Sequence, residues 1–492
     1  MNTADYLLET GQDSQMALIE SAGQYTYGQL RAASARVAAA LLRSGVQPGD
    51  RVGLLGNNSL FWVAAYLAAF KLGAVAVPFA AVQSVETVAA QQALARCKVL
   101  CVERRMQRRF AAAWETPLTM MTETVLEGSG ESIWPATSQW DDHQDAALMF
   151  TSGTTAAPRA VRITHRNIQA NTSSIIEYLD LNAADRMLSV LQFYYCFGAS
   201  LLHTHLRVGG SIVLANSFVY PEVVLDLLEE TASTGLAGVP STFQTLLRNS
   251  TFPKRQIKSL RKVQQAGGKL QNALIQELVQ AVPAGQVYVM YGQTEATARL
   301  SYLEPELLGS KLGSIGRGIP GVALRVMDDS DVEVKPGEVG EIRAWGDNIS
   351  PGYFNEPEAS AQKFVNGALH TGDLATVDED GFIYVVDRKA DFIKSYGYRV
   401  SSQQVEGCIV ELPEVVAAAV IGEPDLARGE AIKAFVVLRQ GSQLTTEQII
   451  GHCTTRLASY MVPQAVVFID QLPTNAHGKI VKAELRRLIA PA

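Results

Sequence analysis

Short apolar segments that end in Gly, Pro or Asn recur through the first 300 residues of this 492-residue chain, and they constrain its fold most. Four of them read SIVLAN, GLAGVP, SLRKVQQAGG and QVYVMYG. Helical patterns separate such segments, as in residues 26–45, where apolar positions recur with a helical period from Thr26 to Gly45. Because wholly apolar strands are typical of sheets covered on both faces, the pattern predicts an α/β fold with parallel sheets.

The pattern changes twice toward the C-terminus. After about Gly313, turn sequences such as DDSD, KPGE and DEDG separate segments that alternate like antiparallel hairpins, and from about Asp391 a small α+β unit begins. A chain this long exceeds one compact core. We therefore expect a large N-terminal domain, residues 1–387, of layered mainly parallel sheets plus a small β-barrel-like subdomain. A small mobile α+β domain, residues 388–492, follows a short charged boundary that favours a hinge.

Composition excludes several classes of function. A net charge of −7 and a pI near 5.6 argue against a nucleic-acid partner, which requires a basic surface. No run approaches the ~20 apolar residues of a membrane span, and the N-terminus lacks the pattern of a secretory signal. Five scattered cysteines favour reduced thiols, and His203 and His205 favour buried or helix-face positions over a metal site. We expect a cytoplasmic protein, either a monomer or a homodimer.

One loop combines hydroxyl groups with a positive charge. Residues 151–159, TSGTTAAPR, follow the apolar segment DAALMF and carry four hydroxyl side chains, a glycine, a proline and Arg159. Ser and Thr favour loops because their hydroxyls bond the nearby backbone, and a hydroxyl-rich loop at a strand end suits an anion. The chain lacks the P-loop motif GxxxxGK[ST], and its glycine-rich segment GSIGRGIPG does not follow a predicted strand. Neither a P-loop nor a Rossmann fingerprint is therefore predicted.

Three further loops carry chemistry at the ends of predicted strands, where open α/β sheets bind their ligands. In YGQTEAT, Thr294 can contact a phosphate and Glu295 can bind Mg²⁺; the alternative is a helix start with Thr294 as the cap. In HTGDLATV, Asp373 lies on a Gly-Asp turn and can bind two ribose hydroxyls, and Arg388 ends the following hairpin. Lys479 follows a glycine in PTNAHGKIVKAEL.

In this order and at these separations, the four loops resemble the adenylate-forming superfamily, which includes acyl-CoA synthetases, acyl-carrier-protein ligases, luciferase and peptide-synthetase adenylation domains. GDRVGLLGNN, VPST, AGG and IKSYGYRV match as well, so the resemblance covers nearly the whole chain. It implies that a small carboxylic acid attacks the α-phosphate of Mg²⁺-bound ATP to give an acyl-adenylate and pyrophosphate. The thiol of CoA, or of phosphopantetheine on a separate acyl or peptidyl carrier protein, then takes the acyl group.

The resemblance also implies a role for each matched residue. The loop around the β- and γ-phosphates comprises Thr151, Ser152, Gly153, Thr154, Thr155 and Arg159. The walls around adenine comprise Ala266, Gly267, Gly268, Tyr291 and Gly292. Asp373 and Arg388 match the ribose contacts, and the catalytic group comprises Lys479, Thr294 at the α-phosphate and Glu295 on Mg²⁺. Lys394 and Gly397 reach the site after the small domain rotates.

The chain departs from the family pattern at several positions. Ala156 and Ala160 replace loop glycines, Arg159 replaces a lysine, and Ala390 stands at the usual hinge position. Where many members carry a histidine behind the acyl pocket, this chain has Tyr195.

The predicted acyl pocket comes from residues 193–200, 238–242 and 264–268, which include Tyr195, Gly198, Gly238 and Ser241 but no formal charge. Adenylation domains for α-amino acids usually carry an acid at the position of Gly198. A buried ammonium would have no partner there, so a neutral aliphatic or aryl acid is favoured, in fatty acid or secondary metabolism. Two alternatives stay open: a stand-alone amino-acid adenylation enzyme and a non-catalytic nucleotide-binding relative.

Overall fold

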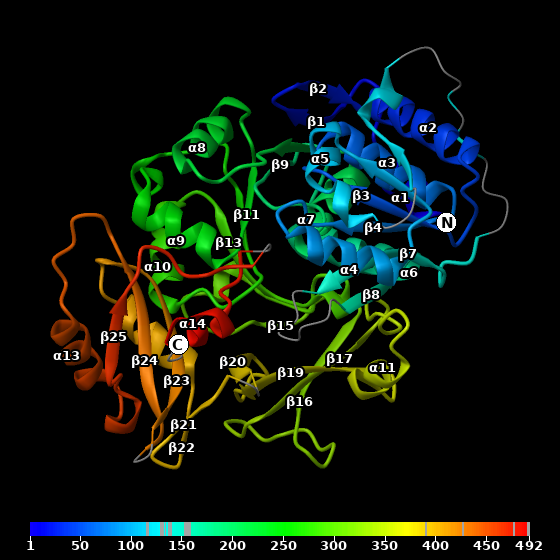
Figure 1. Ribbon diagram of the computed structural model, residues 1–492. Helices are drawn as coiled ribbons and strands as arrows, with labels where there is room; N and C mark the ends of the chain where they lie inside the picture. Colours follow the sequence, from blue (N-terminus) through cyan, green and yellow to red (C-terminus); the bar gives the residue numbers. More distant parts are fainter. Residues whose placement is uncertain are drawn as a thin grey trace.

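Two mainly parallel sheets organise the large N-terminal part of the chain (Figure 1). The structure, a computed structural model, describes residues 1–114, 118–127, 132, 134–135, 140–151, 159–388, 391–425, 428–475 and 478–489. The first sheet has six strands, in the order β6 (Thr119–Met121), β5 (Val99–Val102), β3 (Arg51–Leu55), β4 (Val75–Phe79), β7 (Asp145–Thr151) and β8 (Arg159–Thr164). All of its pairs are parallel except β7 with β8.

The second sheet has nine strands and is parallel at its centre. Their order is β15 (Arg317–Gly318), β14 (Ser301–Leu303), β13 (Gln286–Tyr291), β12 (Lys262–Gln265), β11 (Gly235–Gly238), β9 (Arg186–Ser189), β10 (Ser211–Leu214), β1 (Met16–Glu20) and β2 (Gly23–Thr26). The strands from β13 to β1 run parallel, and antiparallel strands flank them. This confirms the predicted layered, mainly parallel sheets.

Helices connect these strands and bury the sheet faces. The helices of this part are α1 (Thr3–Leu8), α2 (Tyr27–Arg43), α3 (Leu60–Lys71), α4 (Val85–Ala95), α5 (Arg104–Arg109), α6 (His165–Leu179), α7 (Cys196–Val208), α8 (Pro221–Glu230), α9 (Pro240–Asn249) and α10 (Asn272–Ala281). Helix α2 starts where the sequence predicts, because Thr26 and Gln29 form a reciprocal capping box. Helix α3 is apolar around its circumference and buried almost throughout, as expected of a helix inside the core.

Two smaller sheets follow. The predicted barrel-like subdomain corresponds to an antiparallel sheet of β16 (Val322–Met327), β17 (Gly340–Gly346), β19 (Ala368–Val377), β18 (Phe364–Val365) and β20 (Ile383–Arg388), with α11 (Pro357–Lys363) beside it. The last sheet comprises β22 (Tyr398–Val400), β21 (Ile393–Ser395), β24 (Gly429–Leu438), β23 (Val415–Asp425) and β25 (Ala465–Phe468). Its helices are α12 (Ser402–Val410), α13 (Thr446–Arg456) and α14 (Lys482–Ile489). Figure 1 shows this sheet beside α9 and α10.

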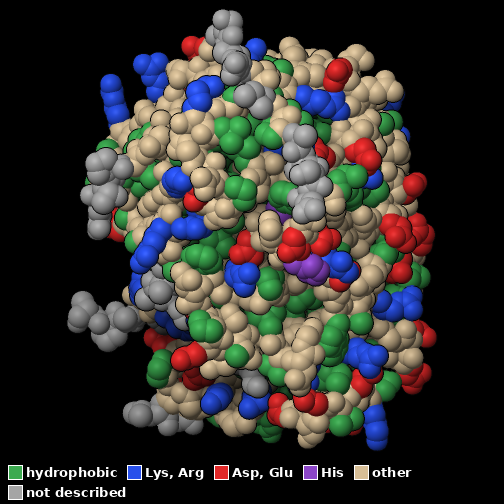
Figure 2. Space-filling model, turned by 90° about the vertical axis from the view of Figure 1, so that its right-hand side faces the viewer, with side chains coloured by type: hydrophobic (Ala, Val, Ile, Leu, Met, Phe, Trp, Pro, Cys, Tyr) green, Lys and Arg blue, Asp and Glu red, His purple; other side chains and the backbone are tan. Residues whose placement is uncertain are grey.

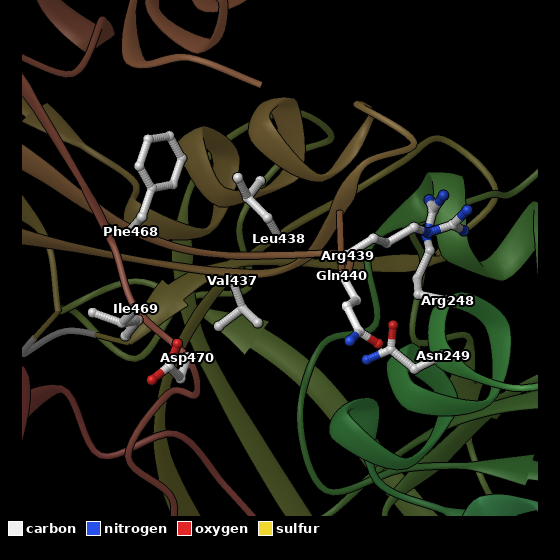
Figure 3. Close-up of a pocket in the computed structure, with 9 residues that line it drawn as sticks. All are labelled: Arg248, Asn249, Val437, Leu438, Arg439, Gln440, Phe468, Ile469 and Asp470. Atoms are coloured by element: carbon white, nitrogen blue, oxygen red, sulfur yellow. The ribbon is translucent and has the colours of Figure 1, made fainter. Parts of the chain in front are cut away.

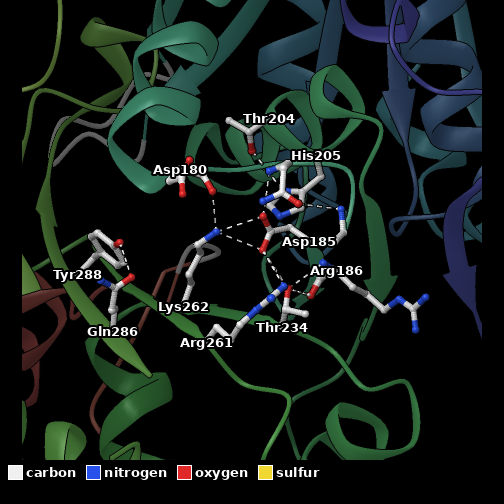
Figure 4. Close-up of polar contacts among 12 residues, drawn as sticks. Asp180, Asp185, Arg186, Thr204, His205, Thr234, Arg261, Lys262, Gln286 and Tyr288 are labelled. Atoms are coloured by element: carbon white, nitrogen blue, oxygen red, sulfur yellow. Dashed lines mark hydrogen bonds and ion pairs between the residues drawn. The ribbon is translucent and has the colours of Figure 1, made fainter. Parts of the chain in front are cut away.

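A polar cluster ties together the amino ends of three central strands (Figure 4). Asp185 precedes β9, Thr234 precedes β11 and Lys262 begins β12. The Asp185 carboxylate, which is 2% exposed, accepts hydrogen bonds from Lys262 Nζ at 3.1 and 3.2 Å and from Thr234 Oγ1 at 3.2 Å. Burial raises the pKa of Asp185, but the Asn182 N–H and the Lys262 ammonium outweigh this and hold it below its usual value. The cluster therefore stabilises the folded state as a buried ion pair.

The surface carries both signs of charge. On the face seen in Figure 2, basic and acidic side chains are interspersed, and hydrophobic side chains emerge in small groups between them. One such exposed pair joins Arg166 and Asp347 at 2.7 Å. Among the helices of the described residues, none has the length and apolar character needed to traverse a bilayer. His203 and His205 are buried, as expected, and all five cysteines are buried and free.

We expect Asp185→Asn to lower the free energy of unfolding by about 3 kcal/mol, because Lys262 keeps its charge and loses its partner. The pKa of Asp185 is lower in the folded state, so its contribution is complete above the unfolded value near ~3.9 and disappears as the pH falls through the folded value. Urea denaturation at pH 7 and pH 3 measures both effects. As a control, Asp347→Asn breaks an exposed pair and changes stability by less than about 1 kcal/mol. Equal losses in the two variants would contradict this account.

Candidate active site

The carboxyl ends of β11, β12 and β13 lie side by side, and the loops that follow them form one edge of the site. The strands are in parallel register, with Gly238 opposite Gln265 and Gln265 opposite Val289. The predicted adenine residues therefore leave neighbouring strands: Ala266, Gly267 and Gly268 follow β12, and Tyr291 and Gly292 end β13. The structure brings these five residues together, as their strand-end positions predict.

Asp373 joins two of the predicted elements. Its Oδ2 accepts a hydrogen bond of 2.6 Å from Tyr291 Oη, and its Oδ1 lies 3.3 Å from Nε of Arg388. Burial, and then the charge of Asp373, raise the pKa of Tyr291 well above its usual value, so this hydroxyl stays a donor. The prediction that Asp373 lies on a turn is wrong: it lies within β19, after Gly372, whose φ of +78° kinks the strand. The kink explains the turn-like sequence.

A tight turn of the C-terminal part carries Lys479 to this edge. The Asn475 N–H donates to the Lys479 carbonyl at 2.9 Å, and the Lys479 N–H donates to Asn475 Oδ1 at 3.1 Å. Ser241 Oγ donates to the Gly478 carbonyl at 3.2 Å, and a Cβ at Gly478 would lie only 3.1 Å from Val239. The turn therefore packs against the segment between β11 and α9, part of the predicted acyl-pocket wall.

The Lys479 ammonium lies 5.7 Å from the centroid of the Tyr195 ring. Burial lowers the pKa of Lys479 and the nearby Arg388 lowers it further, while the charges of Asp373 and Glu295 act in the opposite direction. A buried ammonium of this kind is stabilised when an anion arrives. Lys479 is thus held among residues from four separate strands and loops, all of which the sequence assigned to one site.

Thr294 and Glu295 lie near Arg159, where the predicted phosphate loop ends. Thr294 Oγ1 is 3.5 Å from Cys196 Sγ at the start of α7, and Glu295 Oε1 accepts a 2.8 Å hydrogen bond from Tyr353 Oη. The guanidinium of Arg159 lies 5.1 Å from the centroid of the Tyr353 ring, and its Nε is 3.0 Å from Glu356. Tyr353 thereby links the charge of Arg159 to the carboxylate of Glu295.

The donor set at Glu295 fits a hard cation. A carboxylate is the side-chain ligand that Mg²⁺ prefers, and Tyr353 occupies one lone-pair direction of one oxygen, which leaves acceptor capacity on both. Thr151 ends β7 opposite Arg159, with its Oγ1 3.5 Å from the Arg159 carbonyl oxygen. Ser152, Gly153, Thr154, Thr155 and Ala156 lie outside the described residues, as does Ala390.

Close packing explains three glycines of the predicted pocket. Gly267 has a φ of +87°, and a Cβ there would lie 2.9 Å from both Tyr195 Oη and Val239 Cγ1. A Cβ at Gly198 would lie 2.2 Å from the Gln192 carbonyl oxygen, so this backbone has no room for a side chain. Gly198 thus has a packing role that the sequence did not reveal. Gly238 packs against Thr242 and Phe243 in the same way, with Cβ approaches of 2.8 and 3.1 Å.

Lys394 and Gly397 lie apart from this group. Both are exposed on the β21–β22 hairpin, where the Lys394 N–H donates to Glu430 and Gly397 adopts a φ of +81° at the tip. The structure therefore holds Lys479 at the site and these two residues away from it. Both positions are compatible with the predicted rotation of the small domain.

Three functional candidates escaped the sequence analysis: Tyr353, Lys363 and Cys196. Burial lowers the pKa of the Lys363 ammonium, and the charges of Glu295 and Asp373 counteract this shift. Lys363 Nζ donates to the Thr371 carbonyl at 2.9 Å. Tyr353 pairs with Val161 in an isolated β-bridge and Lys363 ends α11, with no motif around either residue. Cys196 directly follows Tyr195 within the predicted pocket stretch, and this position was the one sequence signal that could have identified it as a candidate.

Comparison with known proteins places the chain in a family. Residues 10–354 match the family model for AMP-binding enzymes, and residues 404–479 match the model for the AMP-binding enzyme C-terminal domain. The chain belongs to the AMP-binding enzymes. Among its relatives, feruloyl-CoA synthase from Amycolatopsis is 34% identical over 465 residues, which cover 94% of this chain and 93% of that protein.

Two solved structures of AMP-binding enzymes match closely. The anthranilate CoA ligase AuaEII in complex with anthranoyl-AMP superposes with a TM-score of 0.92 and 25% identity, over 99% of this chain and 97% of that chain. The o-succinylbenzoate CoA synthetase MenE from Bacillus subtilis, in complex with its acyl-adenylate, superposes with a TM-score of 0.88 and 28% identity, over 99% and 98%. The predicted superfamily and enzyme class are confirmed: this chain is an AMP-forming acid–thiol ligase.

If protonated Lys479 is the catalytic cation, kcat/KM for ATP–pyrophosphate exchange decreases as the pH rises through the pKa of Lys479 in the free enzyme. Because that pKa is lowered, the decrease occurs below the ordinary lysine value of about 10.4. Lys479→Arg keeps its charge at every accessible pH, so the alkaline decrease disappears in this variant even if its rate is lower. An unchanged alkaline limb in Lys479→Arg would assign the ionisation to another group.

Proposed function

We propose that this ligase activates an aromatic carboxylic acid and transfers the acyl group to CoA. The observation that carries the proposal is the position of Lys479, which projects from the C-terminal turn onto the Tyr195 ring at the start of α7. The Phe197 ring lies 6.4 Å from the Tyr195 ring, and Phe193, Tyr195 and Phe197 are all buried. The matched relatives named above act on feruloyl, anthranoyl and o-succinylbenzoyl groups, which are all aromatic.

In the first half-reaction, a carboxylate oxygen of the acid bonds to the α-phosphorus of ATP, and the bond to pyrophosphate breaks. Lys479 bridges the incoming carboxylate and the α-phosphate as a point charge, and Thr294 donates its hydroxyl to the same phosphate. Arg159 holds the outgoing phosphates from the far side. Glu295 would hold Mg²⁺, which neutralises charge on the phosphates when bound. Asp373 accepts from the ribose hydroxyls, with Arg388 and Tyr291 orienting its carboxylate.

In the second half-reaction, the CoA thiol adds to the acyl carbon and AMP leaves. We propose that residues 388–492 rotate as a unit against residues 1–387, withdraw Lys479 and bring Lys394 and Gly397 to the adenylate. The contacts of two adjacent residues support a pivot here. Asp387 accepts hydrogen bonds from Ser401 and Ser402 at the start of α12, whereas Arg388 pairs with Asp373 of the large part. Both sets of contacts cross the proposed boundary between residues 387 and 388, so rotation at that point breaks both.

Part of the interface that would open lies between the end of α9 and the ends of β24 and β25. Arg248 and Asn249 at the end of α9 face Val437–Gln440 of the β24 end and Phe468–Asp470 of the β25 end across a hollow of about 800 Å³ (Figure 3). Arg248 also donates to the Pro413 carbonyl at 3.1 Å. Around this hollow α9 also contacts β23 and α10 contacts α12, so the proposed rotation would separate these packed elements in each catalytic cycle.

Charges around the site disfavour an α-amino acid as substrate. The cations Lys479 and Arg388 lie near the proposed position of the acid, and Asp373 is paired with Tyr291 and Arg388. Position 198, where an acid would pair with an ammonium, has no room for a side chain. An ammonium group would therefore be buried without a partner, at a cost of several kcal/mol.

ATP–pyrophosphate exchange with a panel of aryl, aliphatic and amino acids tests the proposal, with CoA and carrier proteins then compared as acceptors. We expect exchange with aryl acids and an acyl-CoA product. Exchange with α-amino acids alone would overturn the substrate class. Transfer to a carrier protein but not to CoA would overturn the acceptor. Nucleotide binding without exchange for any acid would favour the non-catalytic alternative.

Lys479→Ala should lower adenylate formation by at least about 100-fold, because the transition state loses a preorganised charge. The same variant should transfer the acyl group from supplied acyl-adenylate to CoA at close to the wild-type rate, since Lys479 leaves the site in that step. Lys394→Ala is the matched control and should show the reverse pattern. Equal loss of both half-reactions in Lys479→Ala would contradict the proposed rotation.

A further inference from the structure

The largest fully buried charged side chain of the described residues is Arg299, which is 1% exposed. It follows the Thr294–Ala296 turn and precedes β14. Its Nε donates to Tyr178 Oη at 3.2 Å, its guanidinium lies 4.5 Å from the Phe197 ring centroid, and its Nη2 has no hydrogen-bond partner. No ion pair joins Arg299 to a carboxylate in the described ranges of the chain.

A buried guanidinium without an anion is costly, and the observed contacts compensate only in part. A cation–π contact contributes about 0.5–2 kcal/mol and one neutral hydrogen bond about 1 kcal/mol, against several kcal/mol for removing an ion from water. The other two buried arginines of the described residues have carboxylate partners: Arg248 pairs with Glu277 and Arg343 with Asp331. We therefore expect Arg299 to bind an anion when the enzyme is at work, and this anion must come from outside the described residues.

Arg299 lies next to the groups that activate the acid. Phe197, on which it stacks, directly follows Cys196, and Cys196 Sγ is 3.5 Å from Thr294 Oγ1. Burial raises the pKa of Cys196 and of Tyr195, and the guanidinium charge acts on both in the opposite direction. Two cations therefore contact aromatic rings at the start of α7: Lys479 lies over Tyr195, and Arg299 lies over Phe197.

A second unpartnered polar side chain points toward the same region. Gln264 is 1% exposed, and neither its Oε1 nor its Nε2 has a hydrogen-bond partner. It lies on β12 opposite Tyr288, and because Val263 faces the other core, Gln264 projects toward the side of Tyr288 and Met290. Tyr178, which bonds Arg299, packs against both Tyr288 and Met290. Aromatic rings therefore connect the unpaired amide with the unpaired guanidinium.

We propose that Arg299, assisted by Gln264, binds a second carboxylate on the acid substrate, so that the enzyme activates an aromatic diacid. The proposal rests on the proposed function. Lys479 and Thr294 hold the carboxylate that reacts, and Arg299 holds the one that does not, through charge-assisted hydrogen bonds. The sequence favoured a neutral acid because the three predicted pocket stretches carry no charge. Arg299 lies outside those stretches but contacts Phe197, which belongs to one of them.

Matched acids test this on the wild-type enzyme. Phthalate, isophthalate and terephthalate, together with homologues that carry one or two methylene groups beside one carboxylate, are each compared with their mono-amides in ATP–pyrophosphate exchange. An amide has nearly the shape of a carboxylate but no charge. We expect kcat/KM for at least one diacid to exceed that of its mono-amide by 100-fold or more, since a buried unpaired guanidinium discriminates against the neutral group.

Variants then assign the preference to a residue. Arg299→Gln should reduce the ratio of diacid to mono-amide to below 10-fold, Arg299→Lys should retain part of it, and Gln264→Leu should lower it less. Arg325→Gln removes an exposed arginine, 3.7 Å from Glu333, and should leave the ratio unchanged. If Arg299→Gln does not fold, as judged by thermal melting, the wild-type ratio and Arg299→Lys decide the question.

The outcomes separate the two proposals. Wild-type exchange with aryl monoacids or mono-amides, at rates equal to or above those of the diacids, would overturn the diacid assignment and leave the ligase function intact. An undiminished diacid preference in Arg299→Gln would assign the second carboxylate to another group and overturn the role of Arg299. Absence of exchange with every acid would overturn the proposed function, and the diacid assignment with it.

Discussion

The hydrogen bond between Ser241 and the Gly478 carbonyl fixes the C-terminal turn on the large domain, and the chemistry of the site depends on that contact. The large part of the chain by itself offers Thr294, Glu295 and Asp373, but not the cation that we propose for the reacting carboxylate. Lys479 arrives on a turn that packs against Val239 and Ser241. The same two residues border the predicted acyl pocket, so a bound acid and a docked turn share one wall.

Charge balance organises the rest of the site. Asp373 is paired with Arg388, and Glu295 accepts a hydrogen bond from Tyr353. Within the described part of the chain, no ion pair joins Lys479 or Arg299 to a carboxylate, and both cations lie at the start of α7. Because its carboxylates already have partners while Lys479 and Arg299 have no ion-pair partner among the described residues, the site is suited to negatively charged ligands. The arrangement accounts for the lowered pKa of Lys479 through burial first and neighbouring positive charge second.

The alternation of apolar segments and helical patterns was sufficient to predict both parallel sheets and the small α+β domain, because each element has a local period. The loops of the site were predictable because strand ends collect in space and because four of them matched one family. The environment of each residue was not predictable. Arg299 follows a motif but owes its burial to Tyr178 and Phe197, which come from other helices. Tyr353 and Lys363 likewise reach the carboxylates through tertiary packing, and Asp373 looked like a turn because Gly372 kinks a strand.

The contact between Gly198 and the Gln192 carbonyl has a consequence for how this enzyme can evolve. Any Cβ at position 198 would overlap the backbone of Gln192, which cannot move aside as a side chain can. A single substitution of Gly198 by the acidic residue of the amino-acid enzymes would therefore not fit this backbone. The connection between β9 and α7 would have to be rebuilt first, by insertion, deletion or several substitutions together. We therefore expect substitutions that change the substrate to occur at positions whose side chains already enter the pocket. The short loop at Gln192 makes it difficult for an enzyme of this kind to acquire the acidic residue of the amino-acid enzymes.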